Sequence, residues 1–142
     1  MKSGLIVLAV ATVINSGTPT GERIALRELT ESPKAYIGRQ IIAPGIGCVD
    51  NPKGGFLCVA VVGGQALRIE ASVLGARTKV EIAERLTGDC KGTANLSRSA
   101  CRFDAGIEPT AGYRDTMETP SGSMPITVIV SPSIDMYKPA RR

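Results

Sequence analysis

The residues of this 142-residue chain best suited to chemistry are four cysteines in two close pairs. Cys48 and Cys58 flank the turn-forming run 51–55, while Cys90 and Cys101 flank a polar stretch rich in Gly, Ser and Asn. Structural zinc sites usually separate paired cysteines by two to four residues, whereas nine and ten residues intervene here. We therefore expect two local disulfides. A zinc site and free thiols are the alternatives, and the sequence alone leaves other pairings open.

Other reactive groups form no recognisable catalytic set. The chain has no histidine, which excludes Ser-His-Asp and Cys-His catalysis and every histidine-based metal site. Four carboxylates are scattered along the chain and are expected to be solvated: Asp50, Glu70, Asp89 and Asp104. The Gly-rich pieces lack the length and following helix of a phosphate loop, so they are interpreted as turns. We expect no enzyme activity, no metal and no cofactor.

The bulk composition indicates one globular domain. Hydrophobic residues make up 43% of the chain and charged residues 21%, which argues against wholesale disorder. The 16 glycines and 9 prolines, with only five Phe and Tyr together and no Trp, indicate many turns around an aliphatic core. A net charge of +4 with interspersed signs is too mild to indicate nucleic acid by itself.

The N-terminal segment is typical of an export signal. Lys2 precedes a run at 5–14 that is apolar apart from Thr12, and small polar residues follow. Ten apolar residues suit a signal peptide and are too few to span a bilayer of about 30 Å. We expect a signal peptide at 1–18 with an uncertain cleavage site, a single mature domain at 19–138 without a membrane span, and a loose tail at 139–142. The location is then periplasmic or secreted; a buried first strand is the alternative for 5–14.

Turn residues set the register of three predicted strands at 39–49, 56–62 and 66–71. Gly63-Gly64 is a strong two-residue hairpin signal because both positions can adopt positive φ. Centring the hairpins on these glycines and on Lys53 predicts the opposed pairs Cys48–Cys58, Ile46–Ala60, Cys58–Ile69 and Ala60–Leu67. Directly opposed cysteines in an antiparallel pair lie within disulfide range. We therefore expect one face to be core: Ile46, Cys48, Cys58, Ala60, Leu67 and Ile69.

Helices and further strands surround this ribbon. A short amphipathic helix is predicted at 24–31, with one more turn from Ser32-Pro33 to Tyr36. The clearest helix is 78–87, where Thr78 and Glu81 form a capping-box pattern and one apolar side contains Val80, Ala83 and Leu86. A fourth strand is predicted at 101–107, a long loop at 109–125, and a fifth strand at 126–130 that continues unevenly to Tyr137.

Three strands, a helix and two strands is the order of the OB-fold, a five-stranded Greek-key barrel with its helix between strands three and four. The residues at 26–29, Pro33, the run 36–41 and Gly45 resemble the start of a group of bacterial exported OB-fold domains, which carry a Tyr-x-Gly-Lys/Arg turn before the first strand. Some of these are grouped with anticodon-binding OB modules. The resemblance covers about residues 25–135. It implies the fold, and no catalytic motif transfers with it.

The outer face of the first three strands is the usual ligand surface of that fold. Gly45 and Gly47 on the first strand fit a chain that bends sharply. Base stacking needs aromatic side chains, and only Phe56 lies at the rim. We expect a non-catalytic module that binds a protein or envelope component through this face or the 109–125 loop. Weak single-stranded nucleic-acid binding and a secreted nuclease-like enzyme are the alternatives. The residues expected on the binding face are Leu57, Val59, Val61, Arg68 and Glu70.

Overall fold

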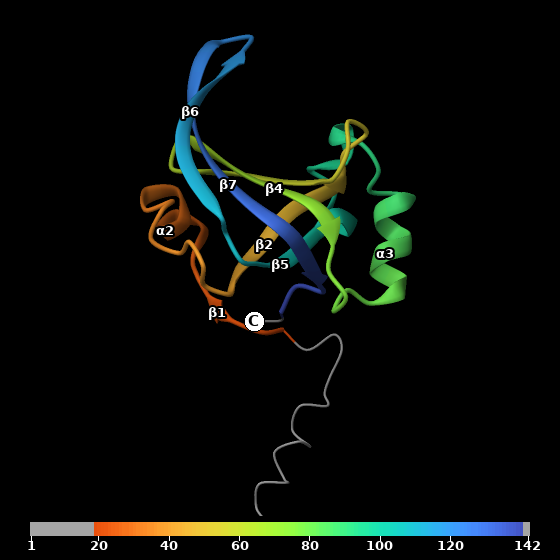
Figure 1. The fold of residues 1–142 in the computed structure, drawn as a ribbon. Helices are drawn as coiled ribbons and strands as arrows, with labels where there is room; N and C mark the ends of the chain where they lie inside the picture. The colour runs from red at the N-terminus through yellow and green to blue at the C-terminus, as the bar shows by residue number, and fades with distance from the viewer. Residues whose placement is uncertain (1–18, 141–142) are drawn as a thin grey trace, which may run out of the picture.

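The computed structural model describes residues 19–140, and the predicted signal peptide at 1–18 lies outside the described residues. Within that range the chain is mostly β, with one sheet of seven strands and two α-helices (Figure 1). This confirms the predicted class, but the expected five strands are exceeded by two. The strands are β1 (Glu22–Arg23), β2 (Ile41–Asp50), β3 (Phe56–Val62), β4 (Gln65–Leu74), β5 (Arg102–Ile107), β6 (Ala111–Thr119) and β7 (Gly122–Tyr137).

The strand pairings close a ring. β2, β3 and β4 pair antiparallel in sequence, and β4 pairs parallel with β7. β7 then pairs antiparallel with β5, and β5 pairs antiparallel with β2. The two additional strands lie outside the ring, because β1 joins β2 and β6 forms a hairpin with β7. The helix α3 (Val80–Thr87) connects β4 to β5.

The predicted register of the first hairpins is confirmed. Cys48 faces Cys58, and Cys58 and Ala60 face Ile69 and Leu67. Gly63 and Gly64 adopt φ of 58° and 80°, as a tight hairpin turn requires. The expected pair of Ile46 with Ala60 is not formed: Ile46 faces Phe103, and the β2–β3 ladder begins at Gly47.

A bulge in β2 explains this difference. The register with β5 shifts between Ala43 and Ile46, and Gly45 adopts φ of 60°. A bulge with a glycine in the left-handed region bends its strand sharply. Along the chain, β2 pairs with β5 over 41–47 and with β3 over 47–50, so the bend lies just before the pairing with β3 begins. The sharp bend itself was predicted from Gly45 and Gly47.

The predicted inward face forms the core. Ile46, Cys48, Cys58, Leu67 and Ile69 are completely buried, and Ala60 is half-buried and packs against them. They join one cluster that includes side chains from every larger element except β6. The largest buried members from other elements are Phe103, Leu29, Leu86, Ile129, Ile134 and Met136.

The first helix, α2 (Leu26–Glu31), is shorter than predicted. Residues 33–37 form turns rather than one more helical turn. Leu29 of α2 is fully buried in the core, and the Thr127 hydroxyl donates to the Thr30 carbonyl at 3.1 Å. Thr127 faces Leu67 of the inward set across the β4–β7 ladder. The helix therefore closes the inner side of the sheet.

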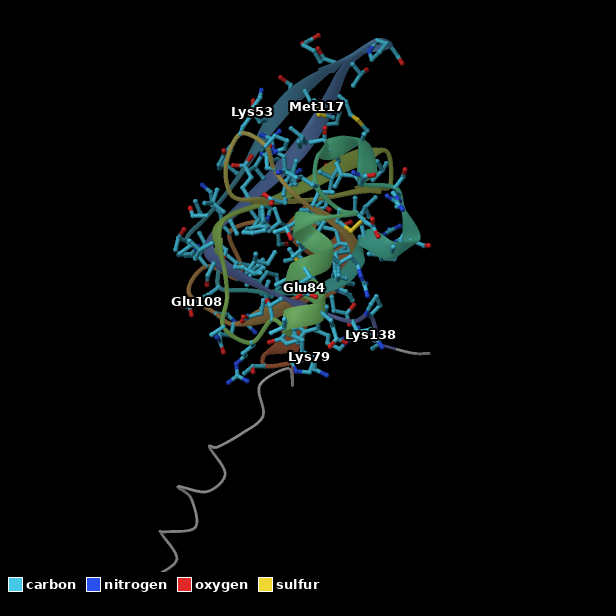
Figure 2. The ribbon with its side chains drawn as sticks, turned by 90° about the vertical axis from the view of Figure 1, so that its right-hand side faces the viewer. Lys53, Lys79, Glu84, Glu108, Met117 and Lys138 are labelled. Atoms are coloured by element: carbon cyan, nitrogen blue, oxygen red, sulfur yellow. A yellow bond between two sulfur atoms is a disulfide. The ribbon has the colours of Figure 1, made fainter. Side chains whose placement is uncertain are left out.

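The second helix begins two residues later than predicted. Lys79 is its N-cap and makes no side-chain capping bond, so the capping-box prediction is wrong. The Thr78 hydroxyl instead accepts a hydrogen bond from the Met136 N–H at 3.0 Å, which ties the start of the helix to β7. Ile82 and Leu86 are buried while Val80 is exposed, so the buried stripe is rotated from the predicted one. Figure 2 shows this helix from outside, with Lys79 at its start and Glu84 on it.

The predicted loop at 109–125 is wrong, because these residues form β6 and the start of β7. Their ladder runs from Ala111 opposite Val130 to Thr119 opposite Gly122, and Pro120-Ser121 make the turn. β7 then continues to Tyr137, which confirms the predicted continuation past Pro132. The hairpin rises above the rest of the sheet (Figure 1).

Candidate functional site

The residues predicted to bind a partner do share one face of the sheet. Across the β3–β4 ladder, Leu57 faces Glu70, Val59 faces Arg68, and Val61 faces Ala66. Opposed residues of an antiparallel pair lie on the same side of the sheet. We call this surface the outer face. It contains the five predicted residues and Ala66, which lies on the same side of the sheet.

Exposure increases along β3 on the outer face. Leu57 is only 9% exposed and belongs to the core cluster, Val59 is half-buried, and Val61 is 69% exposed. The cover at the buried end comes from the segment after α3. A Cβ at Gly47 would collide with the Leu96 carbonyl oxygen, so the glycine allows this segment to cross β2 closely.

An ion pair lies in the middle of the outer face. Arg68 Nε and Glu70 Oε2 are 2.7 Å apart, and the two side chains are 34% and 42% exposed. The buried Nε makes no hydrogen bond despite this short distance, so its N–H is poorly aligned with the carboxylate. Partly exposed pairs of this kind contribute about 0–1 kcal/mol. A ligand group could therefore compete for either partner at little cost.

A hollow of about 390 Å³ lies beside this pair. Its floor includes Leu57, and its rim is formed by the β2–β3 turn and by Thr93. The turn is held by its own hydrogen bonds: Asn51 Oδ1 accepts from the Lys53 N–H at 3.1 Å, and the Asn51 carbonyl accepts from the Gly54 N–H at 2.8 Å. Lys53 belongs to this turn and also lines the hollow. The hollow thus combines an apolar floor with groups of both charges.

The outer face extends further than the sequence indicated. Ala66, Arg68 and Glu70 face Ile126, Val128 and Val130 across the parallel β4–β7 ladder. The apolar residues among them belong to a second apolar cluster, separate from the core, in which Ala66, Ile126 and Val128 are buried and Met117, Met124 and Val130 are partly buried. The predicted fifth strand at 126–130 already contains the alternating Ile126, Val128 and Val130, whereas Met117 and Met124 lie in the predicted loop at 109–125.

The aromatic residue of this face also differs from the prediction. Phe56 packs against the core cluster and faces Ala71, on the inward side. Tyr113 of β6 faces Val128, the neighbour of Arg68, and is 42% exposed. The outer face therefore presents one tyrosine at its edge.

One carboxylate predicted to be solvated is buried. Asp104 is 2% exposed and accepts hydrogen bonds from Arg23 Nη1 at 2.9 Å, the Gly45 N–H at 2.8 Å and the Ala140 N–H at 3.1 Å. It borders a hollow of about 890 Å³ that Arg102 also lines. Because its oxygens hold β1, the bulge of β2 and the C-terminal segment together, Asp104 has a structural role.

Two tyrosines have shifted pKa values. Burial raises the pKa of Tyr36, and the hydrogen bond from its hydroxyl to Glu28 at 3.0 Å raises it further. Burial and the nearby Asp135 carboxylate raise the pKa of Tyr137. Tyr36 lies in the turns after α2 and Tyr137 ends β7, so neither belongs to the outer face.

All four cysteines form disulfides, Cys48–Cys58 and Cys90–Cys101, and none is free. Both local pairings are thus confirmed, and the zinc and free-thiol alternatives are wrong. Two disulfides indicate an oxidising, extracellular compartment. Between residues 19 and 140, no helix is long and apolar enough to cross a membrane.

Comparison with known proteins adds little to this description. No protein-family model matches the chain, and no curated protein matches it. Among solved structures, the chain is similar to one described as an aspartyl-tRNA synthetase from Leishmania major Friedlin. The sequences are 16% identical with a TM-score of 0.43, over 99% of this chain and 26% of the other. The chain thus spans about a quarter of that protein's length, and a likeness of this size defines neither family nor activity.

Proposed function

We propose that this protein is an exported, non-catalytic OB-fold domain that binds another protein or an envelope component through its outer face. The β6–β7 hairpin, which replaces the expected loop, forms one side of that face. Export is supported by the two disulfides and by the signal-like sequence at 1–18.

The order of pairings supports the OB-fold. That fold is a five-stranded Greek-key barrel, and the ring of β2, β3, β4, β7 and β5 has five members in the matching order. Helix α3 lies between the third and fourth members. The turn that carries the resemblance, Tyr36 to Arg39, directly precedes β2, and its Gly38 adopts φ of 82°. β1 and β6 are additions to this plan.

The observation that carries the binding role is the exposure of Val61 beside a second apolar cluster. Val61 is 69% exposed and faces Ala66, whose other neighbour is Ile126. Ala66 and Ile126 are themselves buried, so the exposed apolar surface of this face is Val61 together with the half-buried Val59 and Met124. Exposed apolar surface beside polar groups marks interaction sites. Here the Arg68–Glu70 pair and Lys53 supply those polar groups.

The charges of the face favour a protein over a nucleic acid. Glu70 lies 2.7 Å from Arg68, so a phosphate that approached this cation would be repelled by the neighbouring carboxylate. Tyr113 alone offers a stacking surface, and single-strand binders gain about 1–3 kcal/mol from each stacked base. Weak nucleic-acid binding remains the second candidate, supported by the sequence pI of 9.0.

Site-specific photo-crosslinking in cells that export the protein tests the proposal. A crosslinker at Val61 should give one discrete protein adduct, and Arg68→Ala with Glu70→Ala should abolish it. The matched control is Val80, a valine of similar exposure on α3, which should give no such adduct. Equal adducts at both positions, or an adduct at Val61 that the double substitution does not reduce, would rule out the outer face as the binding surface.

A titration with single-stranded oligonucleotides at two salt concentrations tests the second candidate. Phosphate contacts would give an affinity that falls steeply as salt rises. Absence of binding at both concentrations would remove nucleic acid from consideration.

A further inference from the structure

Within residues 19–140, β6 is the one strand longer than two residues that pairs along a single edge. Its partner is β7, and residues 113–116 are exposed on both faces of the strand. An unpaired edge presents backbone N–H and C=O groups to any strand that can approach it. The outer half of this edge belongs to the hairpin that rises above the sheet (Figure 1), while residues 31–35 lie beside Tyr113 and Arg114.

The residues whose backbone faces this edge can be identified. Thr116 lies opposite Pro125, which has no N–H and so cannot take part in a hydrogen-bonded pair. In a non-hydrogen-bonded antiparallel pair, the N–H and C=O of both residues point away from each other. The Thr116 N–H accordingly donates to its neighbour Asp115 Oδ1 at 2.8 Å. By alternation, Arg114 and Glu118 also present their backbone groups to the edge.

We propose that this edge pairs antiparallel with the same edge of a second copy of the chain, centred on Thr116. Thr116 then faces the partner subunit's Thr116, and Arg114 faces the partner subunit's Glu118. Each of these pairs consists of residues whose backbone groups face the edge, so each exchanges both N–H···O bonds. Directly opposed unlike charges also stabilise antiparallel pairs.

Among the registers that are compatible with a two-fold axis, charge complementarity selects this one. Centring on Asp115 opposes two aspartates, and centring on Arg114 or Glu118 opposes two like charges at the axis. Centring on residue 117 brings Arg114 opposite Pro120, which provides neither charge nor an N–H. Only the Thr116 centre opposes unlike charges, and symmetry repeats that contact on both sides of the axis.

The charged side chains retain bonding capacity for this contact. Arg114 Nη2 donates to the Glu31 carbonyl at 2.9 Å, which uses one of the five donors of a guanidinium. Glu118 Oε2 accepts from the Ser123 hydroxyl at 2.8 Å, which leaves its other oxygen. Both residues are exposed.

The molecule also has room for the partner's hairpin. A groove of about 480 Å³ lies between β6 and residues 31–35, lined on the strand side by Tyr113 and Arg114. In the proposed register the partner subunit's Thr119 lies beside Tyr113, so the partner's turn enters this groove. The paired region is therefore 114–118, because Pro33 already packs against Gly112 at the next position along the edge.

Asp115 limits the strength of this association. Its carboxylate already accepts from the Thr116 N–H, so the partner's carbonyl must displace it. Charged residues on edges commonly restrain unwanted pairing in this way. Asp115→Ala should therefore strengthen the dimer, whereas a role confined to the monomer would leave self-association unchanged.

Sedimentation velocity on the oxidised protein, recovered from cells that export it, tests the proposal. An interface made by one strand edge is small, so we expect a reversible dimer with a Kd on the order of 1–100 µM. Arg114→Glu alone, or Glu118→Arg alone, places like charges opposite each other twice and should weaken the dimer at least about fivefold. An equimolar mixture of these two variants should restore wild-type affinity, because each then meets its opposite.

Two further variants separate pairing from general effects. Glu84→Arg changes the net charge as Glu118→Arg does, but on α3 (Figure 2), and should leave the dimer unchanged. Thr116→Pro removes an N–H that β7 does not use, so the variant should fold with a native circular dichroism spectrum and remain monomeric. A monomeric wild type across this concentration range, a dimer that survives Thr116→Pro, or charge variants that behave like the control would overturn the proposal. None of these outcomes depends on the outer face binding a partner.

Discussion

Removing either disulfide should lower the free energy of unfolding by nearly the same amount. The bridged cysteines lie 10 positions apart in one pair and 11 positions apart in the other. In the chain-entropy model, loops of these lengths each contribute about 2.7 kcal/mol by restricting the unfolded chain. All four cysteines are completely buried, so replacing either pair with alanine removes the same atoms from equally buried positions.

The contacts of the folded structure, taken alone, suggest instead that the two disulfides contribute unequally to the free energy of unfolding. Cys48–Cys58 joins two strands that backbone hydrogen bonds already hold in register. Cys90–Cys101 joins the segment after α3 to the residue directly before β5, and no ladder connects its two ends. If disulfides act by holding native contacts, the second should matter much more. If they act on the unfolded chain, the two should be equivalent.

Urea denaturation of Cys48→Ala/Cys58→Ala and of Cys90→Ala/Cys101→Ala distinguishes these views. We expect losses of about 2–3 kcal/mol that agree within about 0.5 kcal/mol. Both variants should also show larger m-values, because the unfolded chain exposes more surface without a cross-link. A difference above about 1.5 kcal/mol between the two variants would refute the reasoning from loop length.

Three further predictions concern single residues. Gly47→Ala should cost about 1–3 kcal/mol of stability, measured by urea denaturation, because its Cβ meets the Leu96 carbonyl oxygen; an unchanged midpoint would show that this segment moves freely. Asp104→Ala should cost about 2–3 kcal/mol, since it leaves the Gly45 and Ala140 N–H groups without their acceptor; the half-exposed Arg23 adds little. The pKa values of Tyr36 and Tyr137 are raised above 10.0, so their contribution to stability is complete below pH 10 and is lost as pH rises through the folded pKa. Replacing both with Phe should flatten the fall in thermal stability above pH 10, and an unaltered slope would assign that fall to other groups.

The sequence predicted the first three strands well because their turns contain residues with few conformational choices. Gly63-Gly64 fixes one hairpin, and a one-residue slip would place Cys48 and Cys58 on opposite sides of the sheet. Two independent turns therefore agreed on the buried side, which the structure confirms.

The β6–β7 hairpin escaped prediction because its local signals were weak. Its strands carry Gly, Thr, Ser and mixed charge, and the turn is Pro120-Ser121 rather than a glycine pair. The pairing instead depends on β7, which is long enough to hold β4 on one edge and β6 with β5 on the other. Tertiary context of this kind does not appear in a local window of sequence.

The roles of Thr78 and Asp104 could not be read from spacing either. Thr78 has a capping pattern with Glu81, but its hydroxyl accepts from Met136, 58 residues away. Asp104 takes its donors from residues 23, 45 and 140. The hydrogen bonds of both side chains are partly buried and join segments that are distant in the sequence. Only the folded chain brings these partners together.

The carboxylate of Asp104 has a consequence for what can be attached to this domain. Arg23 and Ala140 bond the same side chain, so the two ends of the described chain lie on the same side of the domain. The tip of the β6–β7 hairpin lies on the opposite side (Figure 1). A reporter fused at either end would therefore be carried on the side away from the hairpin. Because the two ends of the described chain lie on the same side (Figure 1), a linker between them would make the domain suited to circular permutation with new ends at an exposed turn.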